Sequence, residues 1–320
     1  MDYLDGKIKE LEAYLPPVTK RPDFDVFWEE TLRITKANPL RPELVKVDYP
    51  SAYVDVYEIS YSGFDETRIY GWYIVPSFLK KDKYPCLVQY HGFGGDRGMA
   101  SDHMQWALMG MAVISVDCRE QGGITGNAAV YSRSGQITNV VSKGILNPDE
   151  YYYRAVYMDC VKALDFAESR PEVDASRLVI RGGSQGGALG MAVCALDDRP
   201  RAGLVSVPGN SNLEARVEGR HGSFAAVNDY LCRYPQHTEQ VYATLSYFDT
   251  MNMSDRISCP MYASVGLADS VCPAKCYYAS YNRIASPKRI EVYPFNEHDG
   301  AHWIQREKEM TYLRELGITE

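Results

Sequence analysis

The 320-residue sequence lacks the features that would attach it to a nucleic acid or a membrane. Its 34 Lys and Arg residues are outnumbered by 42 Asp and Glu residues, which gives a formal net charge of −8. Binding to phosphate backbones is driven by clustered basic residues, so this balance argues against a nucleic-acid partner. No stretch approaches the roughly eighteen consecutive apolar residues of a membrane span, and we therefore expect no membrane partner.

The N-terminus and the cysteines argue against secretion and metal binding. Residues 1–7 have neither the basic start nor the apolar core of a signal peptide, which favours a cytoplasmic location. The eight cysteines are scattered along the chain. Cys272 and Cys276 are four residues apart, but no second Cys or His pair stands near them to complete a zinc site. We expect reduced thiols and no metal, with a disulfide between Cys272 and Cys276 left open.

The order of the apolar patterns predicts a single α/β domain over residues 1–320. Residues 1–40 are expected to form a helical extension, and residues 53–75 an antiparallel hairpin. From residue 85 onward strands and helices alternate, which implies a mostly parallel central sheet with helices on both faces. Residues 210–250 are expected to be an inserted helical segment. No internal repeat interrupts this pattern.

One glycine-rich turn has the pattern of a catalytic nucleophile. The apolar run at 178–180 leads into Gly182-Gly183-Ser184-Gln185-Gly186, which fits G-x-S-x-G between a strand and a helix. Glycine is needed on both sides of the serine because the turn is too tight for side chains there. The alternative is an ordinary turn in which Ser184 caps the next helix.

Ligands of a parallel sheet bind beyond the carboxyl ends of its strands, where the partners of Ser184 are expected. Asp269 follows the strand expected at 261–265, and His298 follows the strand expected at 289–293. The order Ser, Asp, His is that of the α/β-hydrolases. His298 is the candidate base and Asp269 the acid that orients it. The alternatives are His302 as the base, a solvated loop position for His298, and a helix N-cap role for Asp269.

The tetrahedral oxyanion of such a reaction needs two preorganised donors. The backbone N–H of Gln185, at the start of a helix, is one candidate, and the backbone of Tyr90 or of a close neighbour is the other. The position of His91 before Gly92 suits a role in shaping this loop better than a role as the base.

With these residues placed, the chain resembles the acetyl xylan esterase and cephalosporin C deacetylase group, carbohydrate esterase family seven of the α/β-hydrolase superfamily. The resemblance covers nearly the whole chain. Its main strings are Gln89-Tyr90-His91-Gly92, Gly182-Gly183-Ser184-Gln185-Gly186-Gly187, Leu245-Ser246-Tyr247-Phe248-Asp249, Ser264-Val265-Gly266-Leu267-Ala268-Asp269 and Tyr293-Pro294-Phe295-Asn296-Glu297-His298.

The resemblance implies a serine esterase with Ser184, Asp269 and His298 as the triad. The backbones of Tyr90 and Gln185 would form its oxyanion hole. It further implies release of acetate from small carbohydrate esters and from cephalosporin C, no cofactor, a cytoplasmic location and a homo-oligomer, in this family a hexamer. The residues we assign to the substrate pocket are His91, Arg119, Gln121, Pro208, Gly209 and Asn210.

The sequence departs from the family pattern in two places. Glu120 stands where the family's Arg-Gly-Gln has its glycine, which predicts a different local backbone. Gly209 and Asn210 follow Pro208, where the family often has an aromatic residue beside the acyl group, which predicts a wider or more polar pocket. The alternatives to an acetyl esterase are a broader-acyl carboxylesterase, a serine peptidase and a catalytically silent binding protein on the same scaffold.

Overall fold

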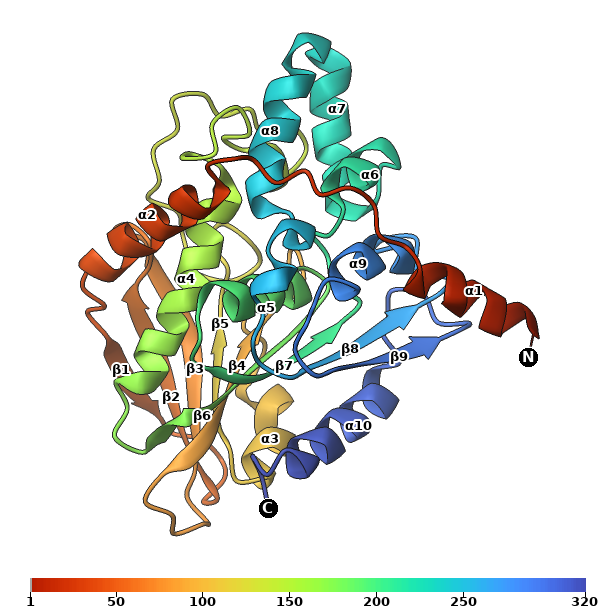
Figure 1. Ribbon diagram of the computed structural model, residues 1–320. Coiled ribbons are helices and arrows are strands. Elements are labelled where there is room, and N and C mark those ends of the chain that lie inside the picture. The colour runs from red at the N-terminus through yellow and green to blue at the C-terminus, as the bar shows by residue number, and fades with distance from the viewer. Residues whose placement is uncertain (1) are drawn as a thin grey trace.

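A computed structural model describes residues 2–320, and it is built around one large sheet (Figure 1). Within these residues the sheet has nine strands in the order β1-β2-β3-β5-β4-β6-β7-β8-β9. The strands are β1 (Glu43–Val47), β2 (Val54–Ser62), β3 (Arg68–Pro76), β4 (Tyr84–Tyr90), β5 (Ala112–Val116), β6 (Val173–Gly183), β7 (Pro200–Ser206), β8 (Met261–Gly266) and β9 (Lys288–Tyr293).

The pairing of these strands confirms the predicted α/β class. Strands β1, β2 and β3 are antiparallel to their neighbours, and β3 pairs antiparallel with β5. All pairs from β5 through β4 to β9 are parallel. The antiparallel hairpin expected at residues 53–75 is the β2–β3 pair. A mostly parallel sheet with an antiparallel start is the architecture expected of an α/β-hydrolase.

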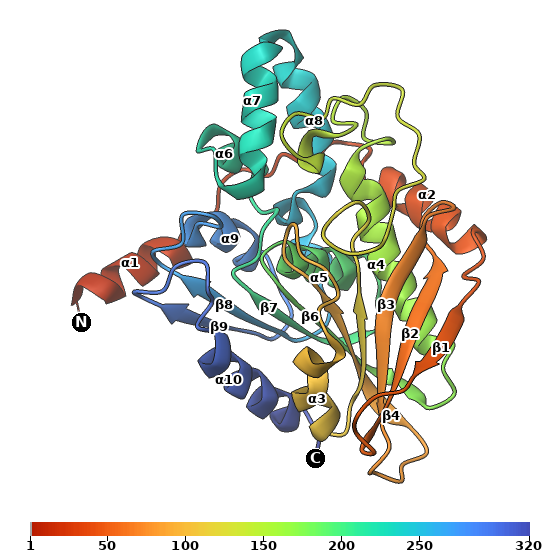
Figure 2. The ribbon, with the colours of Figure 1, turned by 180° about the vertical axis from the view of Figure 1, so that it is seen from behind.

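Helices cover both faces of the sheet (Figures 1 and 2). The α-helices are α1 (Asp2–Glu12), α2 (Phe24–Ala37), α3 (Met104–Leu108), α4 (Tyr152–Glu168), α5 (Gln185–Leu196), α6 (Leu213–Glu218), α7 (Ala225–Arg233), α8 (Thr238–Phe248), α9 (Ala274–Tyr281) and α10 (His302–Glu315). Six short 3₁₀ turns lie among residues 2–320: η1 (Ala100–His103), η2 (Val140–Ser142), η3 (Gly222–Phe224), η4 (Pro235–His237), η5 (Thr250–Asn252) and η6 (Ser254–Arg256).

Two apolar cores result, one on each face of the sheet. The larger contains α2, α4, α5 and α9, and the smaller lies under α3 and α10. All five residues of β5 are buried, as expected for a strand covered on both faces. The helices formed by residues 2–320 include none long and apolar enough to cross a membrane.

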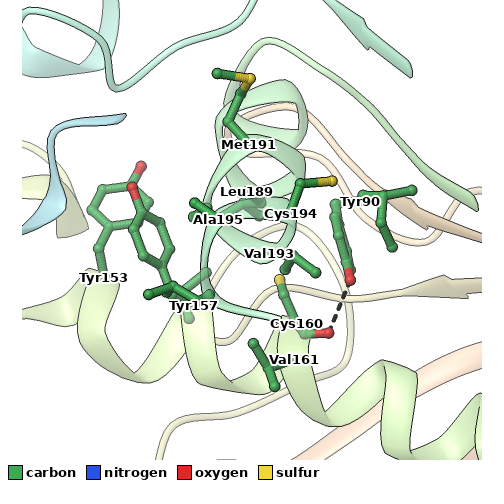
Figure 3. Packing of buried hydrophobic residues seen from close by; sticks show 14 of the residues in the cluster. Tyr90, Tyr153, Tyr157, Cys160, Val161, Leu189, Met191, Val193, Cys194 and Ala195 are labelled. Atoms are coloured by element: carbon green, nitrogen blue, oxygen red, sulfur yellow. Dashed lines mark hydrogen bonds between the residues drawn. The ribbon is translucent and has the colours of Figure 1, made fainter. Parts of the chain in front are cut away.

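Tyrosines hold α4 and α5 against the end of β4 (Figure 3). The hydroxyl of Tyr90 donates a hydrogen bond to the Cys160 carbonyl in α4, at 2.9 Å. Tyr153 and Tyr157 of α4 are fully buried beside α5. A buried tyrosine contributes a large apolar area and needs a partner for its hydroxyl. Helix α4, against which α5 packs, is therefore fixed relative to the strand that carries Tyr90.

The N-terminal extension and the segment inserted between β7 and β8 contact each other. In the N-terminal extension, Trp28 of α2 is buried and its Nε1 donates to the Tyr247 carbonyl of α8. The segment between β7 and β8 contains α6, α7 and α8, which project from the sheet (Figure 1). Hydrogen bonds thus connect the extension to the insertion.

Candidate active site

Ser184 occupies a strained turn between β6 and α5. Its φ of 56° and ψ of −121° lie outside the regions that side-chain-bearing residues favour. A Cβ on Gly182 would lie 2.2 Å from the Gly186 carbonyl, and a Cβ on Gly186 would lie 2.1 Å from the Tyr90 carbonyl. Glycine is therefore required at both positions for the turn to close against β4. The Ser184 side chain makes no capping bond to α5, so the helix-cap alternative does not describe it.

A continuous line of hydrogen bonds joins Ser184, His298 and Asp269. The Nε2 atom of His298 lies 2.8 Å from the Ser184 hydroxyl oxygen, and its Nδ1 lies 2.8 Å from Oδ2 of Asp269. The other oxygen of Asp269 accepts the backbone N–H groups of Val271 and Cys272, each at 2.8 Å. The Asp269 side chain is fully buried, while that of His298 is 29% exposed. The carboxylate is thus fixed, and the imidazole reaches the cavity.

The two loops that carry Asp269 and His298 touch at Gly266. A Cβ on Gly266 would lie 2.3 Å from the carbonyl oxygens of Asn296 and Glu297. Two backbone bonds join the loops, from Leu267 N–H to the Tyr293 carbonyl and from Ala268 N–H to the Asn296 carbonyl. The N-cap of α9 is Pro273, so Asp269 does not have the helix-cap role of the alternative interpretation.

His302 begins α10 and lines the same cavity, but the structure places His298, and not His302, between Ser184 and Asp269. His221 contacts the Ser270 carbonyl, and His237 contacts the hydroxyl of Tyr230. Neither of these side chains therefore faces Ser184.

A cavity of about 520 Å³ opens in front of Ser184. Ser184, Gln185 and His298 line it, together with Gly209 and Asn210 from the predicted substrate pocket. Gln185 is the first residue of α5, so its N–H has no acceptor within the helix. The end of β4 lies directly behind, because the Tyr90 carbonyl is the atom that a Gly186 side chain would strike.

The placement of Arg119 in the substrate pocket is wrong. Arg119 is fully buried, with Nε 2.7 Å from Oδ2 of Asp159 and Nη1 2.9 Å from Oδ2 of Asp65. Burial raises the pKa of Asp159, and the attraction of Arg119 only partly offsets this effect. Asp65 is less buried, and its hydrogen bonds with Arg119 outweigh burial and lower its pKa. This buried guanidinium is held by two carboxylates, connects α4 to the β2–β3 hairpin and does not line the cavity in front of Ser184.

His91, Gln121 and Pro208 also do not line this cavity. Nε2 of His91 accepts the Cys118 N–H at 2.8 Å, so its Nδ1 carries the proton and donates to the Gly92 carbonyl. Burial lowers the pKa of His91, which favours this neutral form. Gln121 donates to the Gln185 side chain at 3.0 Å and accepts the Gly94 N–H. These two residues support the loop behind the site, and Pro208 is buried.

Three arginines that line the cavity are not predicted as site residues from the sequence: Arg181, Arg216 and Arg306. Arg181 gave a signal that could have been used, since it is a charged residue inside the apolar run of β6. Its Nε lies 2.8 Å from Oε2 of Glu309 in α10. Arg216 and Arg306 lie in helical segments. Charged residues are common there, so their sequence positions do not mark them as site residues.

All eight cysteines are free, so the disulfide left open between Cys272 and Cys276 is not formed. Among residues 2–320, His, Cys, Asp and Glu side chains form no group of three or more that could hold a metal ion.

The chain is similar to acetyl xylan esterases in sequence and in structure. A sequence model described as acetyl xylan esterase (AXE1) matches residues 1–316. Acetyl esterase Axe7A of Xylanibacter ruminicola is 30% identical over 314 residues, which are 93% of this chain and 67% of that protein. The acetyl xylan esterase from Paenibacillus sp. R4 is 39% identical with a TM-score of 0.92, over 98% of this chain and 99% of that one. Acetyl xylan esterase 1 from Thermoanaerobacterium sp. JW/SL YS485 is 27% identical with a TM-score of 0.90, over 96% of this chain and 98% of that one.

Proposed function

Because this chain belongs to the acetyl xylan esterase family and is a carboxylic ester hydrolase, we propose that it removes acetyl groups from small acetylated carbohydrates. Acetylated xylo-oligosaccharides are the proposed natural class of substrate, with acetyl esters such as that of cephalosporin C accepted as well. The observation that carries the mechanism is the unbroken line from Ser184 through His298 to Asp269, with both contacts at 2.8 Å.

In the proposed reaction, the Ser184 oxygen attacks the acetyl carbonyl while Nε2 of His298 takes the hydroxyl proton. The backbone N–H groups of Gln185 and Tyr90 stabilise the resulting oxyanion. His298 then gives the proton to the leaving alcohol oxygen, and an acetyl-enzyme forms on Ser184. A water molecule, deprotonated by the same imidazole, attacks this intermediate. The bond between the acyl carbon and the Ser184 oxygen then breaks, His298 returns the proton to that oxygen, and acetate is released. Asp269 holds the proton on Nδ1 throughout, so that Nε2 always faces the reaction.

The test is the Ser184→Ala variant assayed with 4-nitrophenyl acetate. We expect turnover to fall to a background level, with an unchanged circular dichroism spectrum and melting temperature. A fluorophosphonate probe should label the wild type and leave Ser184→Ala unlabelled. Retained turnover or labelling in the variant would refute the assignment of Ser184. An unlabelled, inactive wild type would favour the silent binding protein.

A substrate panel tests the acyl group and the alcohol. It contains acetylated xylo-oligosaccharides, cephalosporin C, 4-nitrophenyl esters of longer acids and a peptidyl 4-nitroanilide. We expect kcat/KM to be highest for the acetyl esters. Equal rates on longer acids would indicate a broader-acyl carboxylesterase, and hydrolysis of the anilide a peptidase.

We also propose a cytoplasmic homo-oligomer, a hexamer by its resemblance to the family. Three large apolar side chains near the start of α10 support association: Phe295 is 94% exposed, Trp303 73% and Ile304 62%. Light scattering on the purified protein should give six times the 36.1 kDa mass of one chain. The mass of a single chain would contradict this proposal.

A further inference from the structure

The cavity in front of Ser184 has a charge opposite to that of the whole chain. The formal net charge of the chain is −8. The Arg, Lys, Asp and Glu residues that line the cavity are Arg181, Arg216, Arg306 and Asp299. Two carboxylates lie behind this lining: Glu309, which pairs with Arg181, and Asp269, which pairs with His298. The lining side chains themselves carry more positive than negative formal charge. A surplus of positive charge in a concave site attracts anions.

Two of the cavity arginines, Arg216 and Arg306, make no salt bridge with another residue of the 2–320 range, and Arg216 is the more deeply buried of the two. It is 2% exposed, and within residues 2–320 no carboxylate lies within 4.0 Å of its guanidinium. Nη1 donates to the Cys272 sulfur at 3.1 Å, and Nη2 to the carbonyls of Val271 at 3.0 Å and His221 at 3.4 Å. Its Nε is buried without a hydrogen-bond partner. A buried cation with only neutral acceptors is costly unless an anion joins it.

The guanidinium also lies next to the reacting centre. A Cβ built on Gly209 would have three nearest neighbours: the Ser184 carbonyl at 3.5 Å, Nη1 of Arg216 at 3.6 Å and the Gln185 nitrogen at 3.7 Å. Gly209 therefore separates Arg216 from the amide proposed to hold the oxyanion. Since glycine has no side chain, the space between them stays open to substrate.

The fold holds Arg216 in place rather than leaving it mobile. The Asp249 carboxylate accepts the backbone N–H groups of Asn212 and Leu213 and so fixes the start of α6. The Phe224 ring lies 5.2 Å from the guanidinium carbon, a cation–π distance. A preorganised guanidinium loses little entropy when it binds a carboxylate.

We propose that Arg216 binds a carboxylate where the ester substrate carries one, so that among otherwise similar esters the enzyme favours the anionic one. The proposal rests on the esterase function proposed above. The carboxylate belongs either to the acyl group or to the alcohol, and the two share the same chemistry at Arg216. In both cases the carboxylate would contact the guanidinium directly, because Arg216 has no carboxylate partner in the protein and lies close to Ser184.

The test compares matched neutral and anionic esters on the wild type and on Arg216→Gln. For the acyl side the pair is 4-nitrophenyl butyrate and the 4-nitrophenyl hemiester of succinate. For the alcohol side it is 3-acetoxybenzamide and 3-acetoxybenzoate. We expect Arg216→Gln to lower kcat/KM for the anionic member of one pair by about 10- to 100-fold, the effect of one hydrogen-bonded charge. The neutral members should change much less. Arg216→Lys, which keeps the charge, should retain part of the preference.

Arg33→Gln is the control for net charge, because it removes a positive charge from an exposed ion pair on α2. It should leave both pairs unchanged. Equal losses on neutral and anionic esters in Arg216→Gln would show that Arg216 only supports the loops, and would overturn the proposal. So would the absence of any loss on both anionic esters.

A binding measurement separates this proposal from the proposed function. Calorimetry with 3-acetoxybenzoate and succinate is done on Ser184→Ala and on Ser184→Ala with Arg216→Gln. Weaker binding of either anion in the double variant supports the carboxylate site even if the wild type hydrolyses no ester. Equal binding in both variants overturns it even if neutral esters are hydrolysed.

Discussion

Oδ2 of Asp269 lies 2.8 Å from Nδ1 of His298, and the second carboxylate oxygen is held by two backbone N–H groups. The carboxylate therefore cannot rotate away from the imidazole without breaking those bonds. Because it accepts at Oδ2, Nδ1 of His298 carries the proton and Nε2 is left as the acceptor toward Ser184. The loop around Asp269 thereby selects the histidine tautomer that a base requires.

The Asp269→Asn variant tests this relationship. The amide oxygen can accept the N–H groups of Val271 and Cys272, which leaves the NH₂ group facing His298. Nδ1 must then accept, so the proton moves to Nε2 and the base is lost. We expect kcat on 4-nitrophenyl acetate to fall by about 10³- to 10⁴-fold, with little change in melting temperature. A kcat close to that of the wild type would contradict the assigned tautomer.

The glycines of the Ser184 turn make a second prediction, on stability. In Gly186→Ala the new Cβ would lie 2.1 Å from the Tyr90 carbonyl, a backbone atom that cannot turn aside. We expect a loss of about 3 kcal/mol in the free energy of unfolding, measured by urea denaturation. Gly183→Ala is the matched variant, because its Cβ would meet only the Ser206 carbonyl at an ordinary 3.8 Å. Similar stabilities in the two variants would contradict the close approach of α5 to β4.

Sequence patterns predicted those parts of the site that depend on topology. The strands that precede Ser184, Asp269 and His298 have recognisable apolar runs. In a parallel sheet their carboxyl ends meet at one edge, whatever the loops between them do. Local patterning and one topological rule were therefore enough to select three side chains that the structure brings within hydrogen-bonding distance.

Side chains that depend on long-range packing could not be placed in this way. The sequence places Arg119 in the pocket by resemblance, but its partners Asp159 and Asp65 lie 40 and 54 residues away in the sequence. No periodicity connects such residues. Arg216 reaches the cavity from an insertion whose course the sequence does not define. Gly209 predicts a wider pocket from the sequence, but nothing in the sequence predicts that the Arg216 guanidinium lies next to it.

Glu120 provides a third prediction. Its φ is 56°, so it adopts the left-handed conformation that glycine favours. Its carboxylate lies 2.7 Å from Lys143 Nζ and accepts a hydrogen bond from Asn127 at 2.7 Å. Bonds from Asn127 and Lys143 outweigh burial and lower the pKa of Glu120. These contacts compensate for a strained backbone.

Two substitutions separate the contacts from the strain. Glu120→Ala removes the contacts and keeps the strain, whereas Glu120→Gly removes both. We expect Glu120→Gly to be more stable than Glu120→Ala by about 1 kcal/mol in chemical denaturation, the cost of a side chain in the left-handed region. The opposite order would mean that the turn relaxes to negative φ when the carboxylate is absent.

Asp249 makes the stability depend on pH. It is 2% exposed and accepts the backbone N–H groups of Asn212, Leu213 and Met251. Burial raises the pKa of Asp249 to about 6 from its ordinary 3.8, although these three bonds oppose the shift. The folded state thus holds this proton more tightly than the unfolded state. Its contribution to stability is complete below pH 3.8 and is lost as the pH rises through 6.

Asp249→Asn, which does not titrate, isolates this contribution. The free energy of unfolding of the wild type, minus that of the variant, should fall by about 2 kcal/mol between about pH 4.5 and pH 7.5. Urea denaturation of both proteins at the two pH values measures the difference, and the titration of all other groups cancels. A difference that grows with pH would mean that the three backbone N–H groups outweigh burial. Asp249 would then stabilise the start of α6, and with it the position of Arg216, most strongly in its charged form.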